Sequence, residues 1–312
     1  EEGNLVAFFG PDFKATFDKQ SGLLTSYLYK KHEYILNGQG PRPFFWRAPT
    51  DNDYGANLPV RLKAWKEASY QEPKAESFQV TPGSNATTIK VTYRFPQTDA
   101  RWDITYKIYA SGVIKVDNRF MAEGDQAPMI PRVGLRMQLP ESFTDLTYYG
   151  RGPKENYRDR RTSQFIGEYA IPVKDMYEPY VRPQENNHRT DIYWCALTDK
   201  TQRGLLLIAD RTFELNASNY SLESMDSGDT IDNGTPRTEK THHRHLTDPL
   251  PEKMVDLFID YRMMGVGGDD SWGATAHEPY LIRPGKENAI EYGFTLVPFD
   301  KKEDYKYLIR QY

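Results

Sequence analysis

Apolar residues alternate with polar ones along many short stretches of this chain, and this two-residue period constrains the fold more than any other feature. The alternation is clearest at Trp102, Ile104, Tyr106 and Ile108, where every second residue is apolar. Side chains of a strand point alternately to its two faces, so the pattern is typical of a strand with one buried face. The pair Ser111-Gly112 follows this stretch and predicts a hairpin turn.

Similar stretches, bounded by turn residues, recur along the chain. The predicted strands are Val6–Gly10, Phe13–Phe17, Leu24–Tyr29, Thr88–Phe95, Trp102–Ile108, Val113–Phe120, Leu135–Leu139, Gly204–Ala209, Val255–Tyr261 and Ile290–Leu296. Helical periodicity is confined to short pieces such as Val60–Ser69, where Leu62, Trp65 and Lys66 share a face. We therefore predict an all-β fold, a large antiparallel β-sandwich.

The length of the chain leaves two possibilities for its domain organisation. At 312 residues it exceeds the ceiling of about 250–300 residues for one hydrophobic core, so it forms two domains or one unusually large sheet assembly. No sequence repeat or clear linker divides it, and the least ordered candidate is Ser224–Lys240. We predict a single domain over residues 1–312. Because the chain begins in a polar segment, we expect a mature protein or a piece of a longer one.

Composition argues against several classes of partner. Lys+Arg 40 against Asp+Glu 44 gives a net charge of −4 with no long block of either sign, whereas nucleic-acid binding needs a basic stripe. No apolar span approaches membrane length and no signal-peptide core is present, so we expect no membrane partner. The single cysteine, Cys195, permits no internal disulfide, and its place beside Trp194 in an apolar run predicts a buried thiol.

A glycine-rich segment near the end of the chain holds the best candidate for ligand binding. The stretch Val255–Tyr261 predicts a half-buried strand, and Met264–Gly273 follows it as a loop. The central residues of this loop are Gly268, Asp269, Asp270, Ser271 and Trp272. The indole of Trp272, broadly apolar with one N–H at its edge, suits stacking on a pyranose ring; the alternative is that Trp272 plugs the end of the sandwich core.

Two polar clusters have some features of metal sites. Asp51–Gly55 begins like a calcium loop, but Ala56 and Leu62 stand where an EF-hand has its glycine and its final glutamate. His243 and His245 would share a face in a strand and could bind a metal, but no further ligand follows at a suitable spacing. We therefore predict no metal site in this chain.

Carboxylates are abundant, but the sequence places no pair of them for acid–base work. Glycosidic cleavage needs two carboxyl groups roughly 5–9.5 Å apart, and the adjacent Asp269 and Asp270 tend to point in different directions. Two long segments dense in arginine, carboxylate and tyrosine, Tyr149–Arg160 and Asp175–Asn186, predict either the rigid frame of a site or an interface. Arg47, just before Asp51–Gly55, suggests a loop held by an arginine–carboxylate fork.

Four motifs occur in the same order as in a known family. They are Phe45–Asp53 (FWRAPTDND), Gly150–Tyr157 (GRGPKENY), Pro179–Asn186 (PYVRPQEN) and Gly267–Trp272 (GGDDSW). Together they resemble the C-terminal, small-chain domain of the lacZ-type β-galactosidases of glycoside hydrolase family 2, over nearly the whole chain. The resemblance implies a galactose-mutarotase-like supersandwich, one very large antiparallel β domain, which agrees with the strand pattern.

The resemblance also implies a division of labour in the hydrolysis of terminal β-D-galactosides. In the family, the catalytic glutamates lie on a TIM-barrel domain that is absent here, so no catalytic residue is expected in this fragment, which would be inactive alone. Trp272 would supply a sugar-stacking platform, and Gly268, Asp269, Asp270 and Ser271 would support its loop.

Partners and cofactors follow from the same resemblance. The implied partners are the remaining domains of the polypeptide, the β-galactoside substrate and further copies in a homo-oligomer. No cofactor is expected in this domain, and metal ions would lie on the catalytic domain. After the tryptophan, Gly273–His277 replaces a serine–proline run of the best-known members. The location of the parent enzyme, bacterial cytoplasm or periplasm, is left open.

Two alternative functions remain open at this point. A free-standing, mutarotase-like sugar epimerase would use a histidine and a glutamate for proton transfer at the anomeric carbon. Its candidate residues are His188, His243, His245, Glu185 and Glu278. A non-catalytic carbohydrate-binding module would rely on the tryptophan platform alone and would bind galactose very weakly, because half of the contacts are missing.

Overall fold

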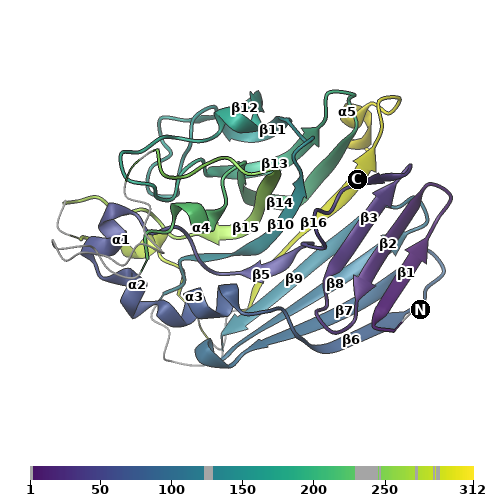
Figure 1. The fold of residues 1–312 in the computed structure, drawn as a ribbon, viewed down its shortest axis with the longest axis horizontal. Helices are drawn as coiled ribbons and strands as arrows, with labels where there is room; N and C mark the ends of the chain where they lie inside the picture. The colour runs from purple at the N-terminus through teal and green to yellow at the C-terminus, as the bar shows by residue number, and fades with distance from the viewer. Residues whose placement is uncertain are drawn as a thin grey trace.

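β-Strands dominate the computed structural model of the chain, which describes residues 3–122, 129–228, 245, 247–270, 273–283, 285 and 289–312 (Figure 1). The strands are β1 (Leu5–Phe9), β2 (Phe13–Asp18), β3 (Leu24–Tyr29), β4 (His32–Glu33), β5 (Arg42–Phe44), β6 (Ala75–Thr81), β7 (Ala86–Phe95), β8 (Ala100–Tyr109), β9 (Ile114–Ala122), β10 (Arg132–Pro140), β11 (Asp145–Gly152), β12 (Phe165–Pro172), β13 (Arg189–Thr198), β14 (Gly204–Ser218), β15 (Met254–Met263) and β16 (Ile290–Phe299). The α-helices are α1 (Asp51–Gly55), α2 (Leu58–Arg61), α3 (Lys63–Tyr70), α4 (Leu222–Met225) and α5 (Tyr305–Leu308). The predicted all-β class is confirmed.

The larger of the two sheets is antiparallel and forks at β14. The first half of β14, from Gly204 to Ala209, pairs with β16, and its second half, from Glu214 to Ser218, pairs with β15. One arm of the fork continues from β16 through β9, β8 and β7 to β6, and the other continues from β15 through β10 to β5. The sheet thus wraps around a core that lies between its arms, as a large sandwich requires.

The smaller sheet, β1 to β4, covers the β6–β9 arm (Figure 1). The rings of Phe17 on β2 and Tyr106 on β8 lie 5.1 Å apart between the two sheets. The Tyr27 hydroxyl donates a 2.5 Å hydrogen bond to the Gly112 carbonyl in the predicted turn between β8 and β9. Gly112 has φ +91°, a left-handed conformation that glycine adopts without steric cost.

The prediction of one continuous helix over Val60–Ser69 is wrong, because this segment forms two helices. Leu62 has φ −112° and ψ 19°, outside the helical region, and separates α2 from α3. Leu62 and Trp65 are both buried, as their shared apolar face predicted. The packing of Leu62 into the core therefore coincides with a break in the helical backbone.

The predicted half-buried strand Val255–Tyr261 is also corrected. In β15 the residues from Met254 to Asp260 are buried on both faces, although Asp256 and Asp260 are charged residues. Arginines of the neighbouring strand β10 lie against both: Arg136 Nε is 2.8 Å from Asp256, and Arg132 Nε is 3.2 Å from Asp260. Buried carboxylates are tolerated because a cation accompanies them.

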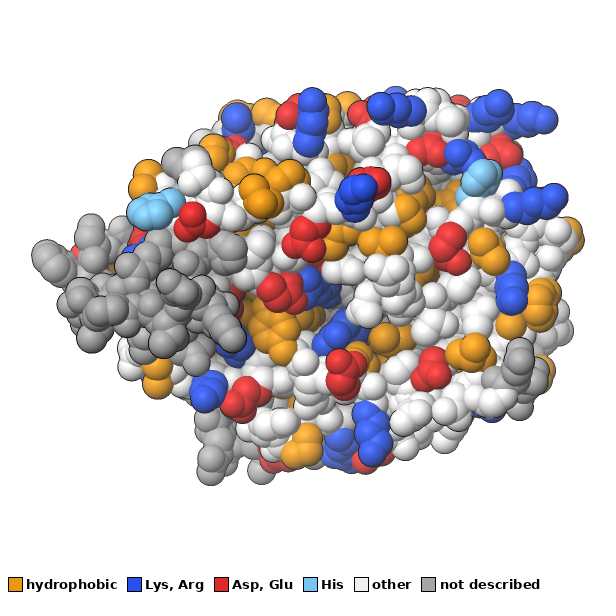
Figure 2. Space-filling view, in the orientation of Figure 1, with side chains coloured by type: hydrophobic (Ala, Val, Ile, Leu, Met, Phe, Trp, Pro, Cys, Tyr) orange, Lys and Arg blue, Asp and Glu red, His pale blue; other side chains and the backbone are white. Residues whose placement is uncertain are grey.

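The remaining expectations concern Cys195 and the surface. Cys195 is buried as predicted, and its burial raises the pKa of its thiol. Acidic and basic side chains are interspersed on the face shown in Figure 2, in agreement with the mixed charge of the sequence. Among the described residues, no helix combines the length and the apolar character needed to cross a bilayer.

Candidate functional site

Arg47 stands at the centre of a buried polar cluster between β5 and α1. Its Nε donates a hydrogen bond of 2.9 Å to Asp53 Oδ2, and its Nη2 donates one of 2.7 Å to Asp53 Oδ1. The predicted arginine–carboxylate fork is therefore confirmed. Burial disfavours the charged guanidinium, but the Asp53 carboxylate outweighs this effect and raises the pKa of Arg47.

The carboxylate of Asp53 also fixes the first turn of α1. The Asp53 amide donates to Thr50 Oγ1 at 3.1 Å, and the Thr50 amide donates to Asp53 Oδ2 at 3.0 Å, which is a reciprocal capping box. The segment Asp51–Gly55 is thus a helix. The pattern of threonine followed three residues later by aspartate was the signal that could have predicted its start.

Arg47 then connects this cluster to the beginning of the glycine-rich loop. Its Nη1 donates to the Met264 carbonyl at 2.8 Å, and its Nη2 donates to the Gly265 carbonyl at 3.1 Å. One buried side chain therefore joins the motif around residues 45–53 to the loop more than 200 residues later. The FWRAPTDND motif thus contacts the residues just before the GGDDSW motif.

The carboxylate of Asp159 holds the same loop by accepting hydrogen bonds from two backbone amides of the loop. The Val266 amide donates to Asp159 Oδ1 at 3.1 Å, and the Gly267 amide donates to Asp159 Oδ2 at 2.9 Å. Asn52 Nδ2 adds a bond of 3.3 Å to the Val266 carbonyl. Asp159 lies two residues after the GRGPKENY motif, so the segment that follows this motif also reaches the loop.

Glu214 on β14 completes the contacts around the start of the loop. Its Oε2 accepts a bond of 2.7 Å from the Met263 amide, and its Oε1 accepts one of 2.5 Å from Arg158 Nε. We call Arg47, Asp159 and Glu214 the loop clamp, and residues 263–267 the loop base. Each member of the loop clamp hydrogen-bonds backbone groups of the loop base, so the path of this backbone is fixed from several sides.

The predicted support residues of the loop lie beyond its base. Gly268 has φ +125°, a backbone conformation that side-chain-bearing residues rarely adopt. Asp269 is exposed, and its Oδ2 lies 2.5 Å from His277 Nε2. Asp270 is exposed, and its Oδ1 accepts a bond of 3.2 Å from the Ala274 amide. Ser271 and Trp272 lie outside the described residues.

A buried polar network lies beside the loop clamp and contains two of the epimerase candidates. Asn216 Nδ2 donates to Glu185 Oε1 at 2.9 Å and to the Asn186 carbonyl at 2.8 Å, so its Oδ1 must accept the 2.7 Å bond from His188 Nδ1. His188 Nε2 donates to Glu214 Oε2 at 2.9 Å. His188 therefore donates from both ring nitrogens and is an imidazolium.

The pKa of His188 agrees with this hydrogen bonding. Burial alone would lower it, but the Glu214 carboxylate outweighs burial and raises the pKa of His188 above its ordinary value. His188 and Glu185 are both buried, with exposed fractions of 0% and 5%, and so face no open cleft. Glu185 belongs to the segment Asp175–Asn186, and His188 follows that segment by two residues.

The other epimerase candidates are dispersed. Glu278 is exposed and pairs with Arg283 at 2.8 Å, while His245 is exposed and uses its amide to bond Asp248 at 2.9 Å. His243 lies outside the described residues. Within the part of the chain that the structure describes, no group of three or more histidine, cysteine, aspartate or glutamate side chains could hold a metal ion.

Asp260 is a second buried carboxylate in this region, and sequence reasoning assigned it no role. It faces Arg132 from the adjacent strand, but neither of its oxygens has a hydrogen-bond partner in the described structure. Burial raises the pKa of Asp260 to about 7, against the opposing influence of Arg132. Gly134 makes room for it, since a Cβ there would lie only 1.8 Å from Asp260 Oδ1.

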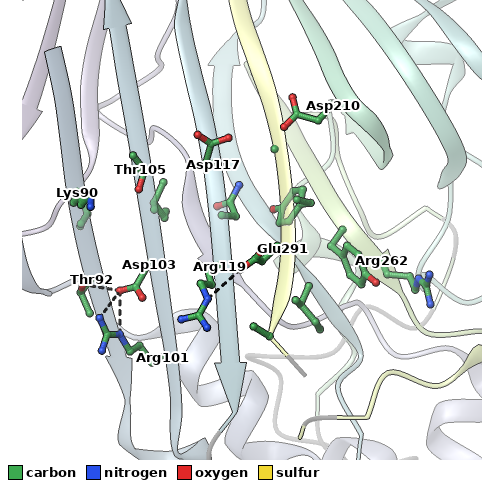
Figure 3. Close-up of a pocket in the computed structure, with 18 of the residues that line it drawn as sticks. Lys90, Thr92, Arg101, Asp103, Thr105, Asp117, Arg119, Asp210, Arg262 and Glu291 are labelled. Carbon is green, nitrogen blue, oxygen red and sulfur yellow. Dashed lines mark hydrogen bonds and ion pairs between the residues drawn. The ribbon is translucent and has the colours of Figure 1, made fainter. Parts of the chain in front are cut away.

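A polar groove of about 1060 Å³ lies on the outer face of the β6–β9 arm and reaches the fork of the sheet (Figure 3). Arg101, Asp103 and Thr105 line it from β8, and they alternate with residues whose side chains enter the core. Charge pairs cover its floor: Arg101 lies 3.0 Å from Asp103, and Arg119 lies 3.1 Å from Glu291.

The two further carboxylates that line the described part of the groove are paired as well. Asp117 lies 3.3 Å from Lys107, and Asp210 lies 2.6 Å from Lys115. Each of the four groove carboxylates therefore has a cationic neighbour. This arrangement is typical of a solvated, charge-balanced surface.

Comparison with known proteins finds similarity to one part of the β-galactosidases. The sequence model of the family described as "Beta galactosidase small chain" matches residues 9–296. A β-galactosidase of Priestia megaterium is 35% identical over 273 residues, which cover 88% of this chain and 25% of the relative. A β-galactosidase of Lactobacillus delbrueckii subsp. bulgaricus is 33% identical over 276 residues, with the same two shares.

Solved structures resemble the chain at much lower identity. A TPR-domain containing protein from Parabacteroides distasonis has a TM-score of 0.52 at 11% identity, with 96% of this chain and 48% of that chain covered. A galactose 1-epimerase from Lactobacillus acidophilus has a TM-score of 0.49 at 6% identity, with 95% and 98% covered. At these identities the similarity concerns the fold alone.

The motifs, the family model and the curated relatives agree on one family. The chain spans about a quarter of the length of the curated relatives that it matches, and the matching family model extends over nearly all of its residues. The predicted resemblance is thereby confirmed. This chain belongs to the β-galactosidase small chain family.

Proposed function

We propose that this chain acts as the C-terminal domain of a β-galactosidase that hydrolyses terminal β-D-galactosides. Its membership of the small chain family supports the reaction class, and its relatives are themselves named β-galactosidases. Because the chain corresponds to about a quarter of those relatives, it would act together with the rest of a longer polypeptide. Residues 1–312 would form one domain of that polypeptide.

The observation that carries this proposal is the contrast along the glycine-rich loop. Its base is held by the buried Arg47 and by Asp159, whereas Asp269 and Asp270 are exposed. A fixed base beneath an exposed continuation favours ligand binding by a side chain of the loop, because the base loses its conformational entropy on folding and not on ligand binding. In our proposal that side chain is Trp272, which follows these residues in the sequence.

The chemistry proposed for Trp272 is stacking. The indole would cover the apolar face of the galactose ring, and its N–H would remain available to a hydroxyl or to water. Gly268, Asp269, Asp270 and Ser271 would support the loop. Stacking of this kind orients the sugar, but it moves no proton and breaks no bond.

Bond cleavage would fall to residues outside this chain. The groove carboxylates have cationic partners, and His188 and Glu185 are buried and hydrogen-bonded to Asn216. Following the family resemblance, we propose that the catalytic glutamates lie on a TIM-barrel domain elsewhere in the polypeptide, together with any metal ions. The domain formed by residues 1–312 would hold no cofactor, and the full enzyme would be a homo-oligomer.

Substitution of Trp272 in the full-length enzyme tests the proposal. We expect Trp272→Ala to raise the inhibition constant of isopropyl thiogalactoside, a non-hydrolysable probe, by roughly tenfold or more, because the stacking face is lost. Trp272→Phe should retain part of the affinity, since an aromatic face remains.

The matched control is Tyr193→Ala, which removes an aromatic side chain of 44% exposure on β13. We expect its inhibition constant to equal that of the wild type. An unchanged constant for Trp272→Ala would contradict the stacking role.

A further inference from the structure

The turn that carries Arg158 and Asp159 is built to send two adjacent side chains to different partners. Tyr157 and Arg160 exchange backbone hydrogen bonds of 3.1 and 2.8 Å, which close a tight turn with Arg158 and Asp159 at its tip. Arg158 Nε donates to Glu214 at 2.5 Å, while Asp159 accepts from the loop base. The turn therefore connects the buried network with the glycine-rich loop.

Both ends of this connection are anchored to the same carboxylate. Glu214 binds Arg158 through Oε1 and the Met263 amide through Oε2, where it also accepts from the buried His188. The turn and the first residue of the loop base are thus held by the same buried carboxylate. Since Glu214 is 1% exposed, solvent cannot replace these bonds without opening the core.

Asp159, on the same turn, holds the middle of the loop base. Its two oxygens each accept one amide, from Val266 and from Gly267, and bonds from backbone amides to an ionised acceptor are among the stronger hydrogen bonds of proteins. The packing is close: a Cβ at Gly265 would lie 2.5 Å from Asp159 Oδ2, so the loop base needs a glycine there. Little freedom remains for the backbone at this point.

We propose that Asp159 is a positioning residue for galactoside binding: it fixes the amides of Val266 and Gly267 relative to the Arg158–Glu214 pair and so sets the course of the chain toward Trp272. Asp159 touches no sugar in this account, and it acts through the loop. The inference rests on the proposed function, because it assumes that Trp272 meets the substrate.

The test is a double-mutant cycle in the full-length β-galactosidase, with the inhibition constant of isopropyl thiogalactoside and the KM and kcat of a chromogenic galactoside as readouts. Asp159→Ala removes both acceptors and should raise the inhibition constant and KM about tenfold, with a smaller change in kcat. Asp159→Asn, which is isosteric and keeps one acceptor, should produce a change of only a few-fold. In the Trp272→Ala background, Asp159→Ala should not raise the inhibition constant any further.

The control variant lies in the same turn. Arg160 is exposed and pairs with Glu155 rather than with the loop, so Arg160→Ala should leave the inhibition constant unchanged. Should Asp159→Ala compromise folding, Asn52→Ala serves instead, because it removes the 3.3 Å bond to the Val266 carbonyl from a partly exposed position. We expect it to raise the inhibition constant about two- to threefold.

The outcomes separate this inference from the proposed function. A normal inhibition constant in Asp159→Ala and in Asn52→Ala, with a raised one in Trp272→Ala, would overturn the positioning role alone. A full additional loss when Asp159→Ala is combined with Trp272→Ala would also overturn it, since Asp159 would then act independently of the tryptophan. An unchanged constant in Trp272→Ala would overturn the proposed function itself.

Discussion

Arginine–carboxylate pairs occur in two contrasting settings in this molecule, the loop clamp and the groove. In the loop clamp, the Arg47 side chain is 2% exposed and that of its partner Asp53 is 7% exposed. In the groove, the corresponding values for Arg119 and Glu291 are 51% and 67%. The same kind of charged pair is therefore buried in one region and exposed to water in the other.

The difference in environment gives the two regions different roles. An exposed pair contributes about 0–1 kcal/mol, whereas removal of one partner of a buried pair costs about 3–5 kcal/mol, because the other charge stays buried without compensation. Arg47 also holds two backbone carbonyls of the loop base. The buried Arg47–Asp53 pair therefore helps to fix backbone next to the proposed site, while the groove pairs cover a solvated face.

The largest expected effect is that of Arg47→Ala. We expect the free energy of unfolding of the 312-residue chain to fall by about 3–5 kcal/mol, since Asp53 loses its cationic partner and the carbonyls of Met264 and Gly265 lose the guanidinium donor. Urea unfolding followed by circular dichroism measures it. The matched control Arg119→Ala should lose less than about 1 kcal/mol. Equal losses in the two variants would remove the contrast between the regions.

An intermediate effect is expected from Asp260, whose carboxylate is buried but poorly hydrogen-bonded. Its pKa is raised from 3.8 to about 7, so between these values the folded chain keeps a proton that the unfolded chain releases. Rising pH then favours unfolding, and the contribution of Asp260 to stability should fall by about 3 kcal/mol from pH 5 to pH 8.

The variant Asp260→Asn removes this titration. We expect its unfolding free energy to vary less than that of the wild type between pH 5 and pH 8, as measured by urea unfolding at each pH. Asp12→Asn, at an exposed position, should keep the pH dependence of the wild type. A slope for Asp260→Asn equal to that of the wild type would show that Asp260 is ionised throughout this range.

The smallest effects are expected in the groove. Asp103→Asn removes a charge from a half-buried pair at the solvated face and Glu291→Gln removes one from an exposed pair, so each should change the unfolding free energy by less than about 1 kcal/mol. In the full-length enzyme, both variants should retain wild-type hydrolysis of a chromogenic β-galactoside. A large loss of kcat in either one would assign catalytic work to the groove.

The strands could be predicted from the sequence because burial decides the alternation of their side chains. In β8, Trp102, Ile104 and Tyr106 are buried, as their spacing predicted. In β15 the same reasoning was incomplete, since Asp256 and Asp260 are buried against arginines of β10 that lie 120 or more residues earlier. A local pattern carries no information about such a distant partner.

The candidate site could be predicted only in part. The fork of Arg47 follows from neighbouring residues, and the importance of the glycine-rich loop follows from its composition and from the family motifs. The role of Asp159 could not be predicted, because the amides that it binds lie 107 and 108 residues later in the chain. Backbone amides have no signature in a sequence, so only the folded chain reveals which of them a carboxylate meets.

Hydrolysis of a chromogenic β-galactoside by these 312 residues, measured alone and again after addition of the remaining part of the β-galactosidase, tests the central claim most directly. We predict no hydrolysis by the chain alone and hydrolysis by the reconstituted enzyme, with weaker galactoside binding when the 312-residue chain carries Trp272→Ala. Hydrolysis by the chain alone would contradict the account, because it would require a catalytic carboxylate pair within these residues.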